Sequence, residues 1–147
     1  MYRKLSGLYS VRSNNSILPQ MFKYLLCWFP MLLLAVLNGT ARDLWYKKYV
    51  SELAAHQIST FSLIILIGLY CYLVVKWFPP NSEKQALTIG IVWTLLTLTF
   101  EFGFGLLRGN SWKQLLHAYN FTEGQIWILI PIWLAIAPSV VYRFMSK

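Results

Sequence analysis

The sequence predicts an all-α fold, in which four transmembrane helices form a bundle and a short amphipathic helix lies at the outer membrane interface. Of the 147 residues, 57% are hydrophobic and 12% are charged, and the mean hydropathy is +0.50. Soluble domains have about 45–50% apolar and about 25% charged residues. The apolar residues gather in four nearly uncharged blocks, each close to the roughly 20 residues that a helix needs to cross a bilayer. No block shows the alternation of a membrane barrel strand.

The charge pattern limits the function classes that need consideration. Thirteen Lys and Arg against five Asp and Glu give a net charge of +8. These basic residues are scattered between the apolar blocks, so a nucleic-acid-binding face is not predicted. Two cysteines are too few for a disulfide scaffold. The expected partner is the lipid bilayer, and a second copy of the chain or another membrane protein remains open.

The N-terminal part divides into a tail and a first span. Residues 1–23 are expected to be a polar, basic, mobile cytoplasmic tail. The first span covers residues 24–41, between Lys23 and Arg42. A cleaved signal peptide is the alternative, because small residues precede Arg42, but the long basic leader argues against it.

The second and third spans have recognisable helix ends. The second covers residues 57–78 and is closed by Pro79. The third covers residues 85–107. Ser82 and Gln85 have the spacing of a capping box, which places the start of this helix just ahead of the span.

The fourth span is expected over residues 124–142. Thr122 and Gln125 again have capping-box spacing, which predicts a helix start there. Pro131 and Pro138 lie inside the apolar block, where membrane helices tolerate proline. We therefore expect a kink in this helix.

Residues 24–147 thus form one domain with an even number of spans, which places both termini on the same side. That side carries eight Lys and Arg, whereas the opposite side carries five. Because positive residues are retained inside, both termini are predicted to be cytoplasmic in a multi-pass protein of the plasma membrane.

A short amphipathic helix is predicted between the third and fourth spans. Ser111 and Gln114 have capping-box spacing, and the apolar residues after Ser111 recur at helical intervals. These apolar residues are Trp112, Leu115, Leu116 and Tyr119. Such a helix lies on the outer membrane surface as an anchor, with a role in ligand binding as the alternative.

Glu101 is the main candidate for a functional residue. It lies seven residues before Arg108, so about 10 Å below the outer boundary of the third span. An ionised side chain costs roughly 2.5–3.5 kcal/mol at the bilayer centre, and less nearer the edge, so it needs compensation. Offsets of 4, 7 and 11 residues place Thr97, Thr94 and Gly90 on the same helix face. We expect this polar, small-residue stripe to face the bundle.

The predicted topology brings further polar residues to the depth of Glu101. They are Asn38, Arg42, His56, Gln57, Thr97, Tyr119 and Asn120. Because an intramembrane carboxylate is a functional hypothesis by default, we interpret the cluster as a ligand-binding or proton/ion site. The alternative is that it only fixes helix packing, with Arg42, His56 or Gln57 as the partner of the carboxylate.

Metal binding and catalysis have weaker support. His56, Glu101 and His117 are suitable metal ligands by type, but no HExxH or CxxC pattern accompanies them. His56 with Ser59 fits a hydrogen bond at a helix start better than a catalytic dyad. We expect no catalytic residue, no metal and no cofactor, and lean against an enzyme.

A set of short motifs lies along the chain between residue 38 and about residue 140. The motifs are Arg42-Asp43, His56-Gln57-Ile58-Ser59-Thr60, Glu101-Phe102-Gly103-Phe104-Gly105, Ser111-Trp112 and Tyr119-Asn120, followed by Gly124 and Trp127. This set resembles an uncharacterised family of small bacterial four-helix integral membrane proteins. The resemblance implies a bacterial inner-membrane location but no activity.

Two functions from different classes follow from these observations. The first is a small polytopic protein that transports or binds a ligand at the polar cluster around Glu101 in the outer leaflet. The second is a structural or accessory membrane subunit, in which the same cluster only holds the helices together.

Overall fold

The computed structural model describes the backbone of residues 2–147 and the side chains of residues 19–147. Within this part of the chain there are helices and turns but no strand, so the predicted all-α class is confirmed. In chain order the elements are α1 (Tyr2–Leu44), the 3-10 helix η1 (Tyr46–Lys48), α2 (Glu52–Trp77), α3 (Glu83–Leu107), α4 (Trp112–His117), the 3-10 helix η2 (Phe121–Glu123) and α5 (Leu129–Met145).

Three helical segments are long and apolar enough to cross a membrane. They are Pro19–Lys48, Glu52–Trp77 and Glu83–Leu107. The last helix, α5, is also apolar, but with 17 residues it is shorter than each of these three segments. The structure therefore supports a membrane protein with three candidate spans.

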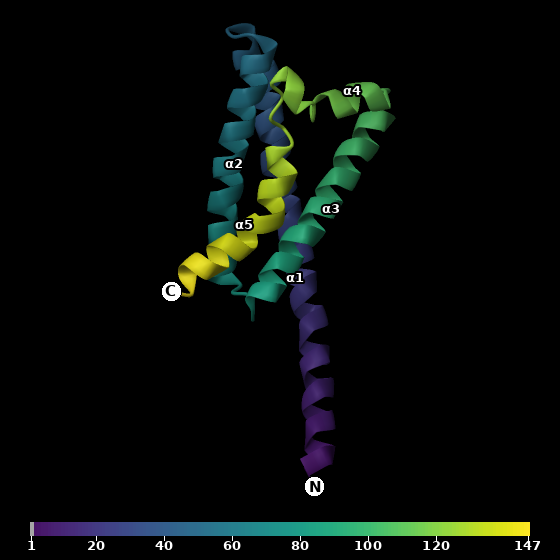
Figure 1. The fold of residues 1–147 in the computed structure, drawn as a ribbon, viewed down its shortest axis with the longest axis vertical. Coiled ribbons are helices and arrows are strands. Elements are labelled where there is room, and N and C mark those ends of the chain that lie inside the picture. The colour runs from purple at the N-terminus through teal and green to yellow at the C-terminus, as the bar shows by residue number, and fades with distance from the viewer. Residues whose placement is uncertain (1) are drawn as a thin grey trace.

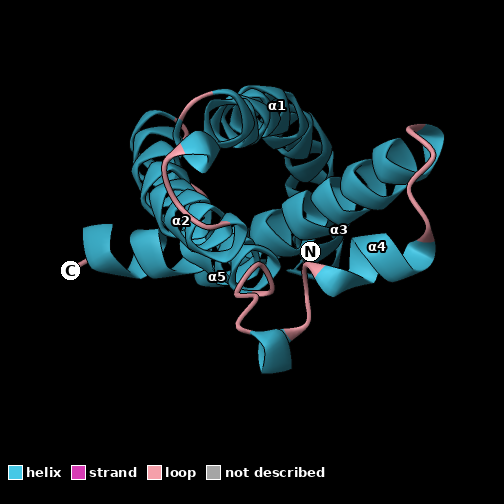
Figure 2. Ribbon diagram, turned by 90° about the horizontal axis from the view of Figure 1, so that it is seen from above, coloured by secondary structure: helices cyan, strands magenta, loops and turns pink. Residues whose placement is uncertain are grey.

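The four long helices pack in a ring. α5 packs against both α2 and α3, while α1 packs against α2 and less extensively against α3. Seen from above, α1 lies across from α5, and α4 runs beside α3 (Figure 2). The turn after α1 and the short helix α4 lie at the end of the molecule farthest from the N-terminus (Figure 1). The α1–α3 contact is the loosest edge of the ring.

The first helix is longer than the sequence predicted. α1 runs from Tyr2 to Leu44 through Pro19 and Pro30, so the backbone of the expected tail, apart from the undescribed residue 1, is helical and continuous with the first span. Its N-terminal part projects beyond the other helices (Figure 1). The side chains of residues 1–18 lie outside the described part of the chain.

The helix starts show which capping predictions hold. Ser82 is the N-cap of α3 and its hydroxyl accepts a bond from the Gln85 backbone, as predicted. Ser51 caps α2 in the same way, with the Ala54 backbone as donor, so α2 begins at Glu52 instead of residue 57. A side-chain oxygen at this position satisfies one of the free N–H groups of the first turn.

The predicted helix start at Thr122 is wrong. Thr122 lies within η2, and Gly124 ends that turn with φ +81°, a left-handed conformation that favours glycine. The backbone oxygen of Gly124 accepts a bond of 3.1 Å from the Gln57 amide, which holds the turn against α2. α5 begins only at Leu129, and it bends along its length (Figure 1), as expected for a helix with Pro138 inside it.

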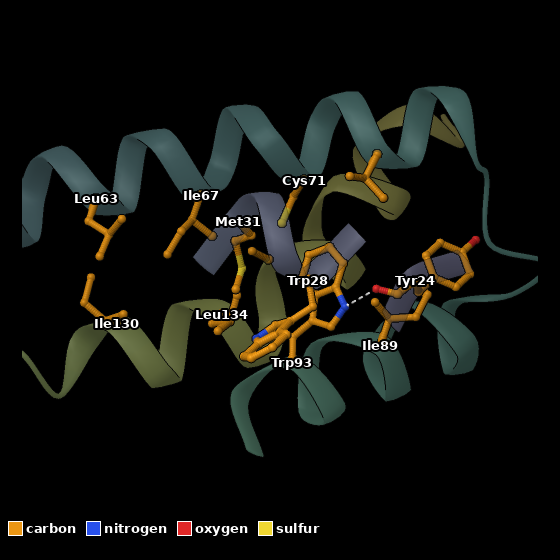
Figure 3. Close-up of a cluster of buried hydrophobic side chains, with 12 residues drawn as sticks. Tyr24, Trp28, Met31, Leu63, Ile67, Cys71, Ile89, Trp93, Ile130 and Leu134 are labelled. Carbon is orange, nitrogen blue, oxygen red and sulfur yellow. Dashed lines mark hydrogen bonds between the residues drawn. The ribbon is translucent and has the colours of Figure 1, made fainter. Parts of the chain in front are cut away.

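The core lies inside the ring and draws on all four long helices. Tyr24, Trp28 and Met31 from α1 meet buried side chains of α2, α3 and α5 there (Figure 3). The indole N–H of Trp93 donates to the Tyr24 carbonyl oxygen at 2.8 Å, which ties α3 to α1 (Figure 3). On α3 the fully buried core residues are Ile89 and Trp93, in the half of the helix nearer the N-terminus.

Candidate functional site

The Glu101 carboxylate is held by two neutral donors. The Tyr119 hydroxyl donates to Oε2 at 2.8 Å, and the Trp127 indole N–H donates to Oε1 at 2.7 Å. Among the residues whose side chains are described, no Lys, Arg or His forms an ion pair with Glu101. The predicted pairing with Arg42, His56 or Gln57 is therefore wrong: the two donors are Tyr119 and Trp127, which precede and follow η2.

The outer helix positions one of these donors. Ser111 and Gln114 form the predicted capping box, with both reciprocal bonds present, and α4 starts there. The Phe102 ring lies between Trp112 and Tyr119, at centroid distances of 5.8 and 5.7 Å. These stacked rings fix the Tyr119 hydroxyl over the carboxylate.

Gly105 allows the same helix to approach α3. A Cβ on Gly105 would overlap the side chain of Leu115, which packs there. Gly103, two residues earlier in α3, makes no such contact, because nothing lies within 4 Å of the place of its Cβ. Only one of the two glycines therefore serves this contact.

Burial keeps Tyr119 in its donor form. Burial and the neighbouring Glu101 carboxylate both raise the pKa of the Tyr119 phenol well above its ordinary value of 10.0. A phenol with a raised pKa stays protonated and can donate throughout the physiological range.

This shift predicts a loss of stability in alkali. The folded-state pKa of Tyr119 lies above its unfolded value, so its contribution is complete below about pH 10 and declines as the pH rises further. Thermal unfolding between pH 8 and 11 is expected to show a steeper loss of stability for the wild type than for Tyr119→Phe. Equal slopes in the two proteins would contradict the assignment.

A pocket of about 320 Å³ opens beside the carboxylate. It lies between α1 and α3, with the start of the outer connection closing one end. Glu101, Arg42 and Thr97 of the predicted set line it. The other lining residues are Leu32, Ala35, Val36, Phe100, Phe104, Gly105, Arg108, Asn110, Leu115 and Trp127.

Arg42 contributes to this pocket without bonding to Glu101. Its guanidinium forms an ion pair with Asp43 at 2.9 Å, and it lies 3.4 Å from Nδ1 of His56. The Arg42 side chain is 15% exposed. The sequence thus placed this arginine in the same cluster as Glu101 but assigned it the wrong partner.

The polar stripe of α3 faces inward, as predicted. Gly90 is buried against α5, and the Thr94 hydroxyl donates to the carbonyl oxygens of Gly90 and Pro131, at 2.9 and 3.3 Å. Thr97 accepts a bond of 3.0 Å from the Trp28 indole. These contacts hold the helix face that carries Glu101.

Three residues of the predicted cluster form hydrogen bonds away from Glu101. Asn38 donates to the Ser59 carbonyl and hydroxyl oxygens, at 2.9 and 2.8 Å, and so ties α1 to α2. The side-chain amide of Gln57 donates to the backbone oxygen of Gly124 and so holds that turn against α2. Asn120 accepts a bond of 2.6 Å from the Thr122 hydroxyl within the outer connection.

The metal candidates do not come together. His117 pairs with Glu123 at 2.6 Å and shares a second outer pocket with His56, apart from Glu101. Among residues 19–147, no three His, Cys, Asp or Glu side chains form a group that could hold a metal ion.

The sequence did not predict that Trp127 donates to Glu101 or that Asn110 lines the pocket. The available signal for Trp127 was a donor-only indole at the start of the predicted fourth span. Arg108 was predicted only to mark the outer boundary of the third span. Asn110 had no sequence signal, because it enters the pocket through the turn at Gly109, where φ is +86°.

Comparison with known proteins adds no assignment: no protein family, curated protein or solved structure matches the chain.

Proposed function

We propose that the chain is a ligand-binding or transport protein of a bacterial inner membrane, in which Glu101 is the ligand-binding carboxylate. The observation that supports this most is a partly buried carboxylate that borders a pocket of about 320 Å³ and has only neutral donors as partners. A structural salt bridge would have neutralised such a charge within the protein. Because an ionisable group within a membrane is costly and marks a binding or transport path by default, we take Glu101 as the binding group.

The proposal includes a four-helix transmembrane domain with both termini in the cytoplasm. α5, at 17 residues, is at the lower limit of the 17–25 residues that span a bilayer, and apolar residues of the preceding turn extend it. The even number of spans and the excess of basic residues on the side of the termini support this orientation. The Glu101 pocket then lies in the outer leaflet.

A lipophilic carbodiimide tests whether the carboxylate can be reached from the membrane. Dicyclohexylcarbodiimide enters apolar surroundings and reacts with the protonated form of a carboxyl group. The reaction is therefore run at mildly acidic pH, where a carboxylate that is ionised at neutral pH takes up a proton, and mass spectrometry locates the adduct. We expect wild-type protein in detergent to be modified at Glu101 and the Glu101→Gln variant to lose this adduct.

A matched pair of variants tests the pocket itself. Val36 lines the pocket, whereas Leu69 on α2 is exposed elsewhere on the apolar surface. Val36→Trp should fill the pocket and slow the modification at least tenfold, while Leu69→Trp should leave the rate unchanged. No modification of the wild type, or equal rates in the two variants, would refute the binding pocket.

The structural-subunit alternative is supported by the fact that both carboxylate oxygens accept hydrogen bonds. These bonds connect α3 to the outer connection and to the segment before α5. Glu101→Gln separates the two functions, because its carbonyl can accept from Trp127 while its amide donates to the Tyr119 oxygen. If the fold survives and binding is lost, Glu101 is a site. If the helices separate in detergent, it is a packing residue.

A further inference from the structure

The Glu101 pocket has a charged end and an apolar end. On α1 the charged residue Arg42 lies six residues beyond Val36, so about 9 Å along the axis. On the α3 side, Arg108 and Asn110 line the same charged end. The rest of the wall is mostly apolar and includes Leu32, Val36, Phe100 and Phe104. A pocket of this polarity fits an amphipathic ligand.

The charged end offers more positive than negative charge. Among the residues whose side chains are described, Arg108 has no carboxylate partner, and its guanidinium lies 5.7 Å from the centre of the Phe104 ring. Arg42 shares its charge with Asp43 and adds a second guanidinium. Two guanidinium groups and an amide are the donors that a phosphate prefers.

The Glu101 carboxylate can take one further donor. Each oxygen accepts one bond within the protein, and an ionised carboxylate has about four acceptor sites. A phosphate group would repel Glu101, but a hydroxyl on the chain side of that phosphate would donate to it. Glu101 lies on that side, toward the membrane centre from Arg108.

The pocket opens toward lipid. It lies at the loosest helix contact, between α1 and α3, and two of its apolar wall residues are exposed on the outside of the helix ring. These are Val36, 46% exposed, and Phe104, 49% exposed. A hydrocarbon chain can therefore enter sideways, and the volume of about 320 Å³ suits one chain better than two.

We propose that the pocket binds a single-chain anionic amphiphile of the outer leaflet, of the lysophospholipid class. Arg42, Arg108 and Asn110 hold the phosphate, and Glu101 accepts a hydrogen bond from the neighbouring free hydroxyl of the glycerol. The acyl chain continues past Glu101 along Val36, Leu32 and Phe100. This inference rests on the proposed binding function of Glu101 and specifies its ligand.

Three probes with the same chain length separate these contacts. Lauroyl lysophosphatidic acid has both the phosphate and the hydroxyl, dodecyl phosphate lacks the hydroxyl, and monolauroylglycerol lacks the phosphate. Their binding to full-length protein in neutral detergent is measured by native mass spectrometry and by protection of Glu101 from the carbodiimide. We expect lysophosphatidic acid to bind most tightly, dodecyl phosphate less tightly and monolauroylglycerol least.

Variants at exposed basic residues supply the matched control. Arg108→Gln should weaken binding of both phosphate probes about tenfold, because a hydrogen bond to a charged group is lost. Lys113 lies on α4 and does not line the pocket, so Lys113→Gln should change affinity less than twofold. Glu101→Gln should reduce the advantage of lysophosphatidic acid over dodecyl phosphate.

The outcomes distinguish the two proposals. Equal binding of monolauroylglycerol, or an equal loss in Lys113→Gln and Arg108→Gln, would overturn the lysophospholipid assignment. If the carbodiimide modifies Glu101 but no probe protects it, the ligand class is wrong while the pocket stands. If Glu101 is never modified, the proposed binding function itself fails.

Discussion

Replacing Gly90 by alanine is expected to lower the free energy of unfolding by about 3 kcal/mol, the upper end of the usual cost of overpacking. The added Cβ would overlap the backbone carbonyl of Ala135, where α3 and α5 pack together. A backbone oxygen cannot rotate away as a side chain can, so the two helices must separate. Equilibrium unfolding in mixed micelles, followed by circular dichroism, measures the change.

Gly103→Ala is the matched control for this prediction. Gly103 lies in the same helix, but nothing is within 4 Å of the place of its Cβ. Alanine there should leave stability unchanged or raise it by up to about 1 kcal/mol, through helix propensity. Equal losses in both variants would show that α3 tolerates no substitution in general and would remove Gly90 as a packing contact.

Replacing Trp127 by phenylalanine is expected to lower the free energy of unfolding by about 1.5–3 kcal/mol, because it removes a hydrogen bond to a charged acceptor. The indole N–H lies 2.7 Å from the Glu101 carboxylate. Trp133→Phe is the matched control, since the Trp133 indole donates to a neutral backbone carbonyl, that of Ile64, at 3.0 Å. Trp133→Phe should lower the free energy of unfolding by about 0.5–1.5 kcal/mol, because the hydrogen bond that it removes is between neutral groups. The same unfolding measurement in micelles compares the two.

A double variant shows whether the charge causes the difference. In a Glu101→Gln background the acceptor of Trp127 is neutral, so the cost of Trp127→Phe should fall to that of Trp133→Phe. The difference between the two backgrounds is the coupling energy of a double-mutant cycle. A cycle with no coupling would show that Glu101 and Trp127 do not interact through an ionised carboxylate.

Local signals explain which elements were predicted well. Ser82 and Ser111 begin helices because their side chains satisfy free N–H groups, a property of a few neighbouring residues. Thr122 carries the same spacing, but the turn at Gly124 is held by Gln57 from α2. That contact is distant in sequence, so no local pattern could place the start of α5.

The partners of Glu101 show the same limit. The sequence identified the carboxylate and the inward face of α3, since these follow from helical spacing and hydropathy. It favoured Arg42 as partner by charge, whereas Arg42 pairs with its neighbour Asp43. Which of several donors at one depth reaches the carboxylate depends on helix rotation and on the outer connection, and these are set by packing.

By itself, the sequence determined an all-helical, membrane-compatible chain with a carboxylate on the inward stripe of its third apolar helix, because composition and periodicity are summed along the chain. Only the tertiary structure decided that Tyr119 and Trp127 hold Glu101, and that a pocket lined by Arg42 and Arg108 opens between α1 and α3. The physical reason is that contacts between distant segments depend on how the helices pack together. Because the core around Trp93 is close-packed, the position of each helix depends on the side chains of the others.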